Sequence, residues 1–311
     1  MKVLVIGAGA LGGYFGGCLV RAGRDVTFMV RQRRAEQLGR DGLQLIRPGG
    51  NFSVPARVLI AGAITEPFDL VLVALKSYSL DGAIPQFAPA VGSQTIIVPV
   101  INGIAHLQTL SARFGEDQVF GGMALVSATL DPDERIVQLL PNDELVYGEL
   151  SGQLTDRTAA VSTLFNGAGF NARASELIMQ EMWEKWTLLA TNAGMTCLMR
   201  ASIGDIIAAP RGSSTILKLF RECSAVAEAS GYKPRASFIE FCMKLLLQAG
   251  SPLKASMLRD IERAASTEGD HVLGDMVARA RRLNVETPIL DLAHTHVAAY
   301  EIGRNRSAAP S

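Results

Sequence analysis

The sequence predicts an α/β fold, in which an N-terminal Rossmann-type doubly wound sheet precedes an all-helical C-terminal domain. Three observations support this prediction. Short apolar runs alternate with helix-like stretches in the first part of the chain, a glycine-rich turn follows the first run, and strand patterns end near residue 175. With 311 residues the chain is long enough for two cores. We therefore expect one domain over residues 1–174 and another over residues 175–311.

The strands predicted in the first domain are short apolar runs without polar alternation. Such runs are typical of strands buried on both faces of a parallel sheet, and they cover residues 2–6, 25–30, 70–75, 95–99 and 118–121. More alternating runs follow, separated by proline-containing turn signals, at residues 124–130, 135–140 and 144–149. These runs predict antiparallel strands that extend the same sheet.

The second domain is predicted from amphipathic patterns with a helical period. The patterns cover residues 175–199, 214–230, 237–248, 268–282 and 288–302. Proline and glycine residues that end helices separate them at residues 210–212, 231–234 and 250–252. Because ligand sites favour domain interfaces, we expect the active site in the cleft between the two domains.

A glycine fingerprint, G-x-G-x-x-G, follows the first predicted strand and consists of Gly7, Ala8, Gly9, Ala10, Leu11 and Gly12. In such a motif the first glycine makes a tight turn, the second lets the backbone approach a pyrophosphate, and the third allows close helix–strand packing. The following helix would direct its N-terminal N–H groups at the phosphates. Because a strand precedes the motif and a helix follows it, the motif predicts a dinucleotide site rather than a structural turn.

The end of the second predicted strand indicates which dinucleotide is bound. NAD enzymes usually place Asp or Glu there to bind the ribose 2′-hydroxyl. Here Val30 is followed by Arg31, Gln32, Arg33 and Arg34, with no carboxylate. A guanidinium binds a phosphate with paired hydrogen bonds. We therefore predict NADP(H) as the cofactor, with Arg31 at the 2′-phosphate, and a solvated basic loop is the alternative.

Polar residues also follow two later strands of the predicted sheet. Lys76 follows residues 70–75, and Asn102 follows residues 95–99. Ligands of open α/β sheets lie outside the carboxyl ends of the strands, so both residues are candidates for cofactor and substrate binding. The alternatives are a surface lysine and a turn asparagine.

Two ionisable residues of the second domain are candidates for the chemistry. Lys185 lies in a largely apolar helix, where desolvation would lower its pKa and suit it to donate a proton. The alternative is a surface lysine with a buried stem. Glu268 lies at the start of another predicted helix, where helix capping alone would explain a glutamate.

Composition narrows the class of protein. Hydrophobic residues make up 48% and charged residues 19%, and the formal net charge is zero, which favours a globular protein without a nucleic-acid or membrane partner. Met1 leads directly into the first strand without a signal-peptide pattern, so we expect a cytoplasmic protein. The four cysteines lack paired spacing and predict buried free thiols. The four histidines lack metal-ligand spacing, so no metal site is expected.

Together these motifs resemble the ketopantoate reductase (2-dehydropantoate 2-reductase) family over almost the whole chain. The resemblance implies reduction of 2-dehydropantoate to pantoate, in pantothenate biosynthesis, with hydride passing from NADPH to the keto carbon. It implies Lys185 as the general acid, with Glu268 as its catalytic partner. The substrate-binding residues that it implies are Lys76, Asn102, Ser256 and Glu268, and Lys76 and Asn102 would also contact the cofactor.

One departure from that family concerns the substrate. Pantoate-forming members usually have asparagines four and eight residues after the catalytic lysine, where this chain has Leu189 and Ala193. Asn192 lies about 20° from Lys185 around an ideal helix and would substitute as a substrate-binding residue. The less polar pocket leaves a different 2-keto acid open as the substrate. A dinucleotide-sensing protein without catalysis is a third alternative, and a homodimer formed through an apolar helical face is also left open.

Overall fold

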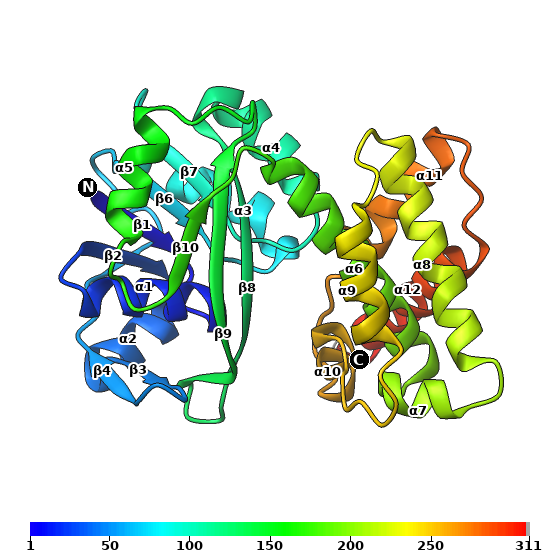
Figure 1. Ribbon diagram of the computed structural model, residues 1–311. Helices are drawn as coiled ribbons and strands as arrows, with labels where there is room; N and C mark the ends of the chain where they lie inside the picture. Colours follow the sequence, from blue (N-terminus) through cyan, green and yellow to red (C-terminus); the bar gives the residue numbers. More distant parts are fainter. Residues whose placement is uncertain (309–311) are drawn as a thin grey trace. The chain divides into compact units, whose positions relative to one another are not determined.

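The computed structural model describes residues 1–308 and has the predicted α/β fold (Figure 1). The chain forms two compact units, Met1–Met179 and Gln180–Ser311. The first unit contains all the strands of the described chain, and the second is helical. Within residues 1–308, no helix is both long enough and apolar enough to cross a membrane.

The first unit is built around a parallel sheet with the strand order β5-β2-β1-β6-β7. Its strands are β1 (Lys2–Ile6), β2 (Asp25–Val30), β5 (Val58–Ile60), β6 (Leu70–Val73) and β7 (Ile96–Pro99). Every residue of β6 and β7 is buried, which explains why these strands lack polar alternation. The helices that follow β1, β2, β6 and β7 are α1 (Ala10–Arg21), α2 (Gln32–Asp41), α3 (Leu80–Phe87) and α4 (Ala105–Phe114).

The prediction that residues 124–149 extend this sheet is wrong, because these residues belong to a second sheet. That sheet has the order β10-β9-β3-β4, with β8 paired to β9. Its strands are β3 (Leu43–Ile46), β4 (Phe52–Val54), β8 (Phe120–Leu130), β9 (Ile136–Glu149) and β10 (Asn171–Ala174). The long β8–β9 hairpin is antiparallel, as its alternating pattern predicts, but the two runs predicted at residues 135–140 and 144–149 form one continuous strand, β9. The other neighbours of β9 come from short segments with no strong strand pattern.

The predicted strand at residues 118–121 is only partly present. Glu116–Gln118 is a short 3₁₀ helix, Val119 forms an isolated parallel bridge to Ile97, and β8 begins at Phe120. A Cβ on Gly122 would lie 2.1 Å from the carbonyl oxygen of Pro99, so β8 packs against the end of β7 too closely for any larger residue. The chain therefore leaves the first sheet after one residue and enters the second.

Helix α1 packs between the two sheets through a face of small residues. A Cβ on Gly16 would lie 2.4 Å from the ring of Phe28 in β2, and one on Gly13 would lie 2.4 Å from Ile136 in β9. The last helix of this unit, α5 (Asp156–Phe165), begins at Thr155, whose hydroxyl accepts a hydrogen bond from the Arg157 N–H. The close packing of Gly13 and Gly16 against the two sheets holds α1, and with it the loop that precedes α1, in a fixed position.

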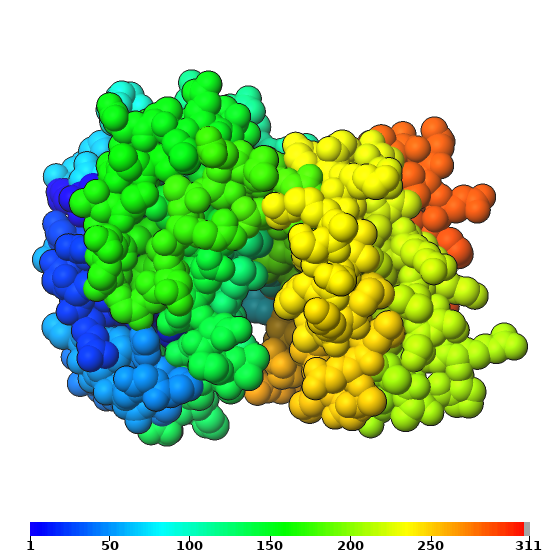
Figure 2. All heavy atoms as spheres, viewed as in Figure 1, coloured from blue at the N-terminus to red at the C-terminus, as the bar shows by residue number. Residues whose placement is uncertain are grey.

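The second unit contains every helix predicted for it and two short ones that were not predicted. The helices are α6 (Ile178–Met199), α7 (Ile203–Ala208), α8 (Gly212–Ala229), α9 (Ala236–Leu246), α10 (Ser256–Glu262), α11 (Asp275–Arg282) and α12 (Pro288–Ala308). The short helices α7 and α10 have too few turns to show a clear period. The pattern over residues 268–282 begins as a π-helix, Asp270–Gly274, before α11. Figure 2 shows α9 (yellow) on the surface of this unit, where Phe241 is exposed.

Candidate active site

The glycine loop between β1 and α1 has the shape that a dinucleotide pyrophosphate requires. Gly7 has a φ of +92°, which makes the turn, and a Cβ on Gly12 would lie 2.0 Å from the carbonyl oxygen of Gly7. A Cβ on Gly9 would meet no atom within 4 Å, so this side of the loop is open. Gly9 is also the N-cap of α1, and no side chain of the described residues caps it. The free N–H groups of α1 and the open loop fit a bound phosphate group.

Lys76 and Asn102 lie at the same edge of the sheet as this loop. In the sheet register Ile6 is paired with Val73, and Val73 with Pro99, so the chain segments after β1, β6 and β7 leave the sheet side by side. Leu75 packs against the loop, because a Cβ on Gly7 would lie only 2.9 Å from Cδ2 of Leu75. Helices connect β1 to β2 on one side and β6 to β7 on the other, so this edge is the topological switch point of the sheet.

The three arginines after β2 have different environments. Arg31, the N-cap of α2, is exposed and has no polar side-chain partner among residues 1–308. Arg34 is largely buried, and its Nε donates to the carbonyl oxygen of Ala8 in the glycine loop at 3.1 Å. Burial lowers the pKa of Arg34, and the nearby charge of Glu134 opposes that effect. Arg34 therefore supports the loop, whereas Arg31 is free to bind an anion.

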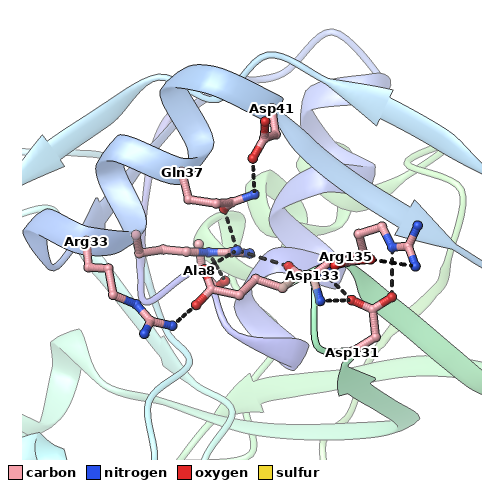
Figure 3. Close-up of polar contacts among 9 residues, drawn as sticks. Ala8, Arg33, Gln37, Asp41, Asp131, Asp133 and Arg135 are labelled. Atoms are coloured by element: carbon pink, nitrogen blue, oxygen red, sulfur yellow. Dashed lines mark hydrogen bonds and ion pairs between the residues drawn. The ribbon is translucent and has the colours of Figure 1, made fainter.

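Glu134 supplies the carboxylate that the sequence around β2 lacks. It lies in the turn between β8 and β9 and forms ion pairs with Arg33 and Arg34 (Figure 3). The sequence presents three arginines for a 2′-phosphate. Two of them, Arg33 and Arg34, are instead paired with a carboxylate about 100 positions later in the chain. No local signal could have shown this, since only the tertiary fold brings the β8–β9 turn to α2.

In the second unit, Lys185 on α6 and Glu268 lie within electrostatic range of each other. Burial lowers the pKa of the Lys185 ammonium from 10.5 to about 8, and the Glu268 carboxylate opposes the shift. Glu268 itself is only 7% exposed. A lysine with this pKa is protonated at neutral pH and still a good proton donor.

Two neighbours of Lys185 anchor this part of α6. The indole Nε1 of Trp186 donates to the carbonyl oxygen of Val272, in the π-helix that follows Glu268, at 2.9 Å. On the other side, the buried Glu184 carboxylate accepts hydrogen bonds from the Arg235 backbone N–H at 2.8 Å and Nε at 2.9 Å. Trp186 thus links the helix of Lys185 to the segment of Glu268. Sequence reasoning did not identify either role, since both depend on non-local contacts.

The Lys185 face of α6 also carries Leu189 and Asn192. Leu189 is partly exposed, whereas Asn192 is 8% exposed and its Oδ1 has no hydrogen-bond partner among the described residues. A buried carbonyl oxygen without a protein partner is usually satisfied by water or a ligand. Ser256 is exposed at the first position of α10, and the preceding N–H, of Ala255, donates to Thr196 of α6 at 3.4 Å.

The remaining ionisable residues offer no metal site. Within residues 1–308 no group of three or more His, Cys, Asp or Glu side chains could hold a metal ion. His294 contacts Asp270 at 3.1 Å. His106, which the sequence presented as an isolated histidine, is 1% exposed in the first turn of α4, four positions after Asn102.

Comparison with known proteins assigns the chain to a family. The family model described as "Ketopantoate reductase PanE/ApbA" matches residues 3–152, and "Ketopantoate reductase PanE/ApbA C terminal" matches residues 177–301. An uncharacterized oxidoreductase, YkpB, of Bacillus subtilis (strain 168) is 36% identical over 301 residues, covering 97% of this chain and 99% of the relative. A 2-dehydropantoate 2-reductase of Mesorhizobium japonicum is 26% identical over 313 residues, covering 94% and 95%.

The fold is also that of solved oxidoreductases. A D-mandelate dehydrogenase solved with NADH and anilino(oxo)acetate superposes with a TM-score of 0.87 at 20% identity, covering 98% of this chain and 99% of that one. The two family models together match most of the chain. The glycine loop at the switch point is consistent with this assignment. The chain belongs to the ketopantoate reductase family of oxidoreductases.

Proposed function

We propose that this protein reduces 2-dehydropantoate to pantoate with NADPH. The observation that carries the proposal is Lys185, a lysine with a pKa lowered to about 8 and a buried carboxylate, Glu268, within electrostatic range. Reduction of a keto group needs one hydride and one proton. The bound cofactor supplies the hydride, and Lys185 is suited to supply the proton.

Each residue has a role that follows from its chemistry. Lys185 donates its proton to the carbonyl oxygen of the substrate as that oxygen gains negative charge, and Glu268 helps keep Lys185 protonated and accepts a hydrogen bond from the substrate. Lys76 is a cation suited to the substrate carboxylate, and Asn102 and Ser256 are suited to its polar groups. In the first unit the N–H groups after Gly9 hold the pyrophosphate.

A second candidate function keeps the fold and the hydride chemistry but changes the substrate. Leu189 is a partly exposed apolar side chain one turn of α6 after Lys185, where pantoate-forming relatives are expected to have asparagine. An apolar wall favours a 2-keto acid with a larger apolar side chain over one with a hydroxyl group. The orphaned Oδ1 of Asn192 favours the first candidate, because it can accept a hydrogen bond from a substrate hydroxyl.

A panel of 2-keto acids assayed with NADPH and with NADH tests both candidates. The first predicts the highest kcat/KM for 2-dehydropantoate with NADPH. A higher kcat/KM for pyruvate, a branched 2-keto acid or phenylglyoxylate selects the second. Tight NADPH binding without turnover of any keto acid would indicate a protein that senses the dinucleotide without catalysis.

Substitution of Leu189 separates the two candidates further. Leu189→Asn should raise kcat/KM for 2-dehydropantoate relative to a branched 2-keto acid by roughly tenfold, because it adds a polar partner to the pocket. Leu189→Ala is the matched control, since it removes volume without adding polarity. Equal effects of the two substitutions on both substrates would remove Leu189 from the specificity determinants.

A further inference from the structure

We propose that Glu134 is a specificity-determining residue of the cofactor site, which holds Arg33 in an ion pair and so weakens the preference for a dinucleotide with a 2′-phosphate. The inference rests on the proposed use of NADPH and concerns the adenosine end of the same site. It assigns a function to a turn that lies far from the glycine fingerprint in the sequence.

The contacts of Glu134 show that its carboxylate is committed to the arginines of α2. One carboxylate oxygen forms an ion pair with Arg33, and the other lies 3.4 Å from Nη1 of Arg34. The backbone carbonyl oxygen of Glu134 also accepts from Nη1 of Arg34 at 3.0 Å. The Glu134 side chain is 23% exposed, whereas that of Arg33 is 86% exposed. The carboxylate is thus fixed, and the guanidinium is the partner that can move.

The turn that carries Glu134 is held by its own hydrogen bonds. The Asp131 carboxylate accepts from the backbone N–H groups of Asp133 at 3.0 Å and Arg135 at 2.9 Å, and from Nε of Arg135 at 2.7 Å. Glu134 has a φ of 60°, in the left-handed region. Figure 3 shows Asp131, Asp133 and Arg135 of this turn on one side, and the α2 side chains of Arg33, Gln37 and Asp41 on the other. The turn therefore presents the Glu134 carboxylate to α2 in a defined direction.

The three arginines then divide into different roles. Arg34 is occupied, because it donates to Ala8 at 3.1 Å, to Gln37 at 2.6 Å and to Glu134. Arg31 is exposed without a polar partner among residues 1–308, so it can bind a phosphate. Arg33 lies two positions after Arg31 but is paired with Glu134. Only one of the three guanidinium groups is free for a 2′-phosphate.

The electrostatic consequence differs between the two dinucleotides. A 2′-phosphate near Arg31 must compete with Glu134 for Arg33, and moving Arg33 to the phosphate breaks its ion pair with Glu134. NADH lacks this phosphate and feels neither effect at this position. Glu134 therefore lowers the affinity for NADPH more than that for NADH, and added salt should reduce the difference.

Glu134→Gln tests this inference, because it removes the charge and keeps the size of the side chain. Titration calorimetry of the full chain should be done with NADPH and NADH, and with 2′,5′-ADP and 5′-ADP as fragments that differ at the 2′ position. We expect the Kd of NADPH and 2′,5′-ADP to fall roughly five- to tenfold. The Kd of NADH and 5′-ADP should change less than about twofold.

Two further variants show whether the effect acts through Arg33. Asp133→Asn is the matched control, since Asp133 lies in the same turn but pairs with Arg135, and it should leave the NADPH/NADH ratio unchanged. In an Arg33→Ala background, Glu134→Gln should lose most of its effect. A full effect without Arg33, an unchanged ratio in Glu134→Gln, or an equal change for both dinucleotides overturns the inference.

Arg33→Ala alone decides the matter if Glu134→Gln does not fold. Because Arg33 is already paired, its removal should change the Kd of NADPH less than about twofold, whereas Arg31→Ala should raise it roughly tenfold or more. A loss with Arg33→Ala as large as that with Arg31→Ala overturns the inference. Failure of the unmodified chain to bind either dinucleotide overturns the proposed function as well, whereas NADPH binding with an unchanged ratio overturns this inference alone.

Discussion

At the scale of single residues, Lys185 is a lysine whose surroundings disfavour its own charge. Most of its side chain is removed from water, and burial lowers its pKa to about 8. The charge of the nearby Glu268 carboxylate raises it. The balance between these two effects keeps the ammonium protonated at neutral pH while making its proton easier to transfer.

The pKa of Lys185 predicts the pH dependence of the reaction. If Lys185 is the proton donor, as proposed, the protonated form is required for reduction, so kcat for reduction should be constant below about pH 8 and fall as the pH rises through that value. In the reverse direction the neutral amine is the required form, so oxidation of the hydroxy acid should rise over the same range. Both profiles can be measured by the absorbance of the reduced cofactor.

Substitution of the same residue checks that assignment. Lys185→Ala should lower kcat by at least ~10² and abolish the pH dependence near 8, as expected for a lost general acid. Lys218→Ala, at an exposed lysine of α8, is the matched control and should behave like the unmodified enzyme. An unchanged kcat in Lys185→Ala would exclude Lys185 as the proton donor.

The glycine loop leads to opposite predictions for two of its members. Gly9→Ala adds a methyl group where no protein atom lies within 4 Å, so stability should be retained while the Kd of the dinucleotide rises. Gly12→Ala places a methyl group 2.0 Å from the Gly7 carbonyl oxygen and should cost about 1–3 kcal/mol of stability.

Thermal unfolding with and without NADPH separates these two effects. Gly9→Ala should keep the Tm of the free protein and lose the increase caused by the cofactor. Gly39→Ala, in the exposed part of α2 with no atom near the added Cβ, is the control for a harmless substitution. A lower Tm in Gly9→Ala without cofactor would contradict the open loop seen here.

At the scale of elements, the π-helix Asp270–Gly274 follows Glu268 and is bonded to Trp186 of α6, the helix of Lys185. A π-helical turn shifts the register of its carbonyl groups, and here the Val272 carbonyl accepts from Trp186. Trp186 directly follows Lys185 in α6, and Val272 lies four residues after Glu268. One hydrogen bond therefore ties the helix of Lys185 to the segment that follows Glu268.

Trp186→Phe tests this link, because it removes the N–H and keeps an aromatic ring. The unpaired Val272 carbonyl should cost about 1–3 kcal/mol of stability. If the bond positions Glu268, KM for the keto acid should rise and the pH midpoint near 8 should move, while the Kd of NADPH stays the same. A loss of stability with unchanged KM and pH midpoint would limit Trp186 to a structural role.

At the scale of the whole molecule, the four thiols report on folding. Cys18, Cys197, Cys223 and Cys242 are all buried and unpaired. Burial raises the pKa of Cys18 to about 11 and those of the other three to about 12. Thiolate, the reactive form, is therefore scarce in both units of the folded chain.

We expect a thiol reagent such as Ellman's reagent to react slowly with the native protein and with all four cysteines after denaturation. Activity should accordingly be insensitive to mild oxidants and to added reductant. Rapid modification of a thiol in the native protein would show that one of the two units opens locally. The modified residue, identified by mass spectrometry, would locate the opening.

The sequence by itself determined four of the five strands of the first sheet, all but β5, as well as the glycine loop and the helical character of the second unit. Strands such as β1 and β6 are buried on both faces, so they appear as continuous apolar runs. The glycine motif could be recognised because its backbone geometry excludes side chains at Gly7 and Gly12. These features are local, so their signals lie within a few consecutive residues.

Only the tertiary structure decided the second sheet and the environment of the charged residues. Besides its hairpin partner β8, β9 pairs with β3 and β10, which come from other parts of the chain, and no local pattern specifies these two pairings. Likewise the arginines after β2 appeared free of carboxylates until the fold brought Glu134 to them. Periodicity reflects burial along one segment, whereas an ion pair depends on the path of the chain between its partners.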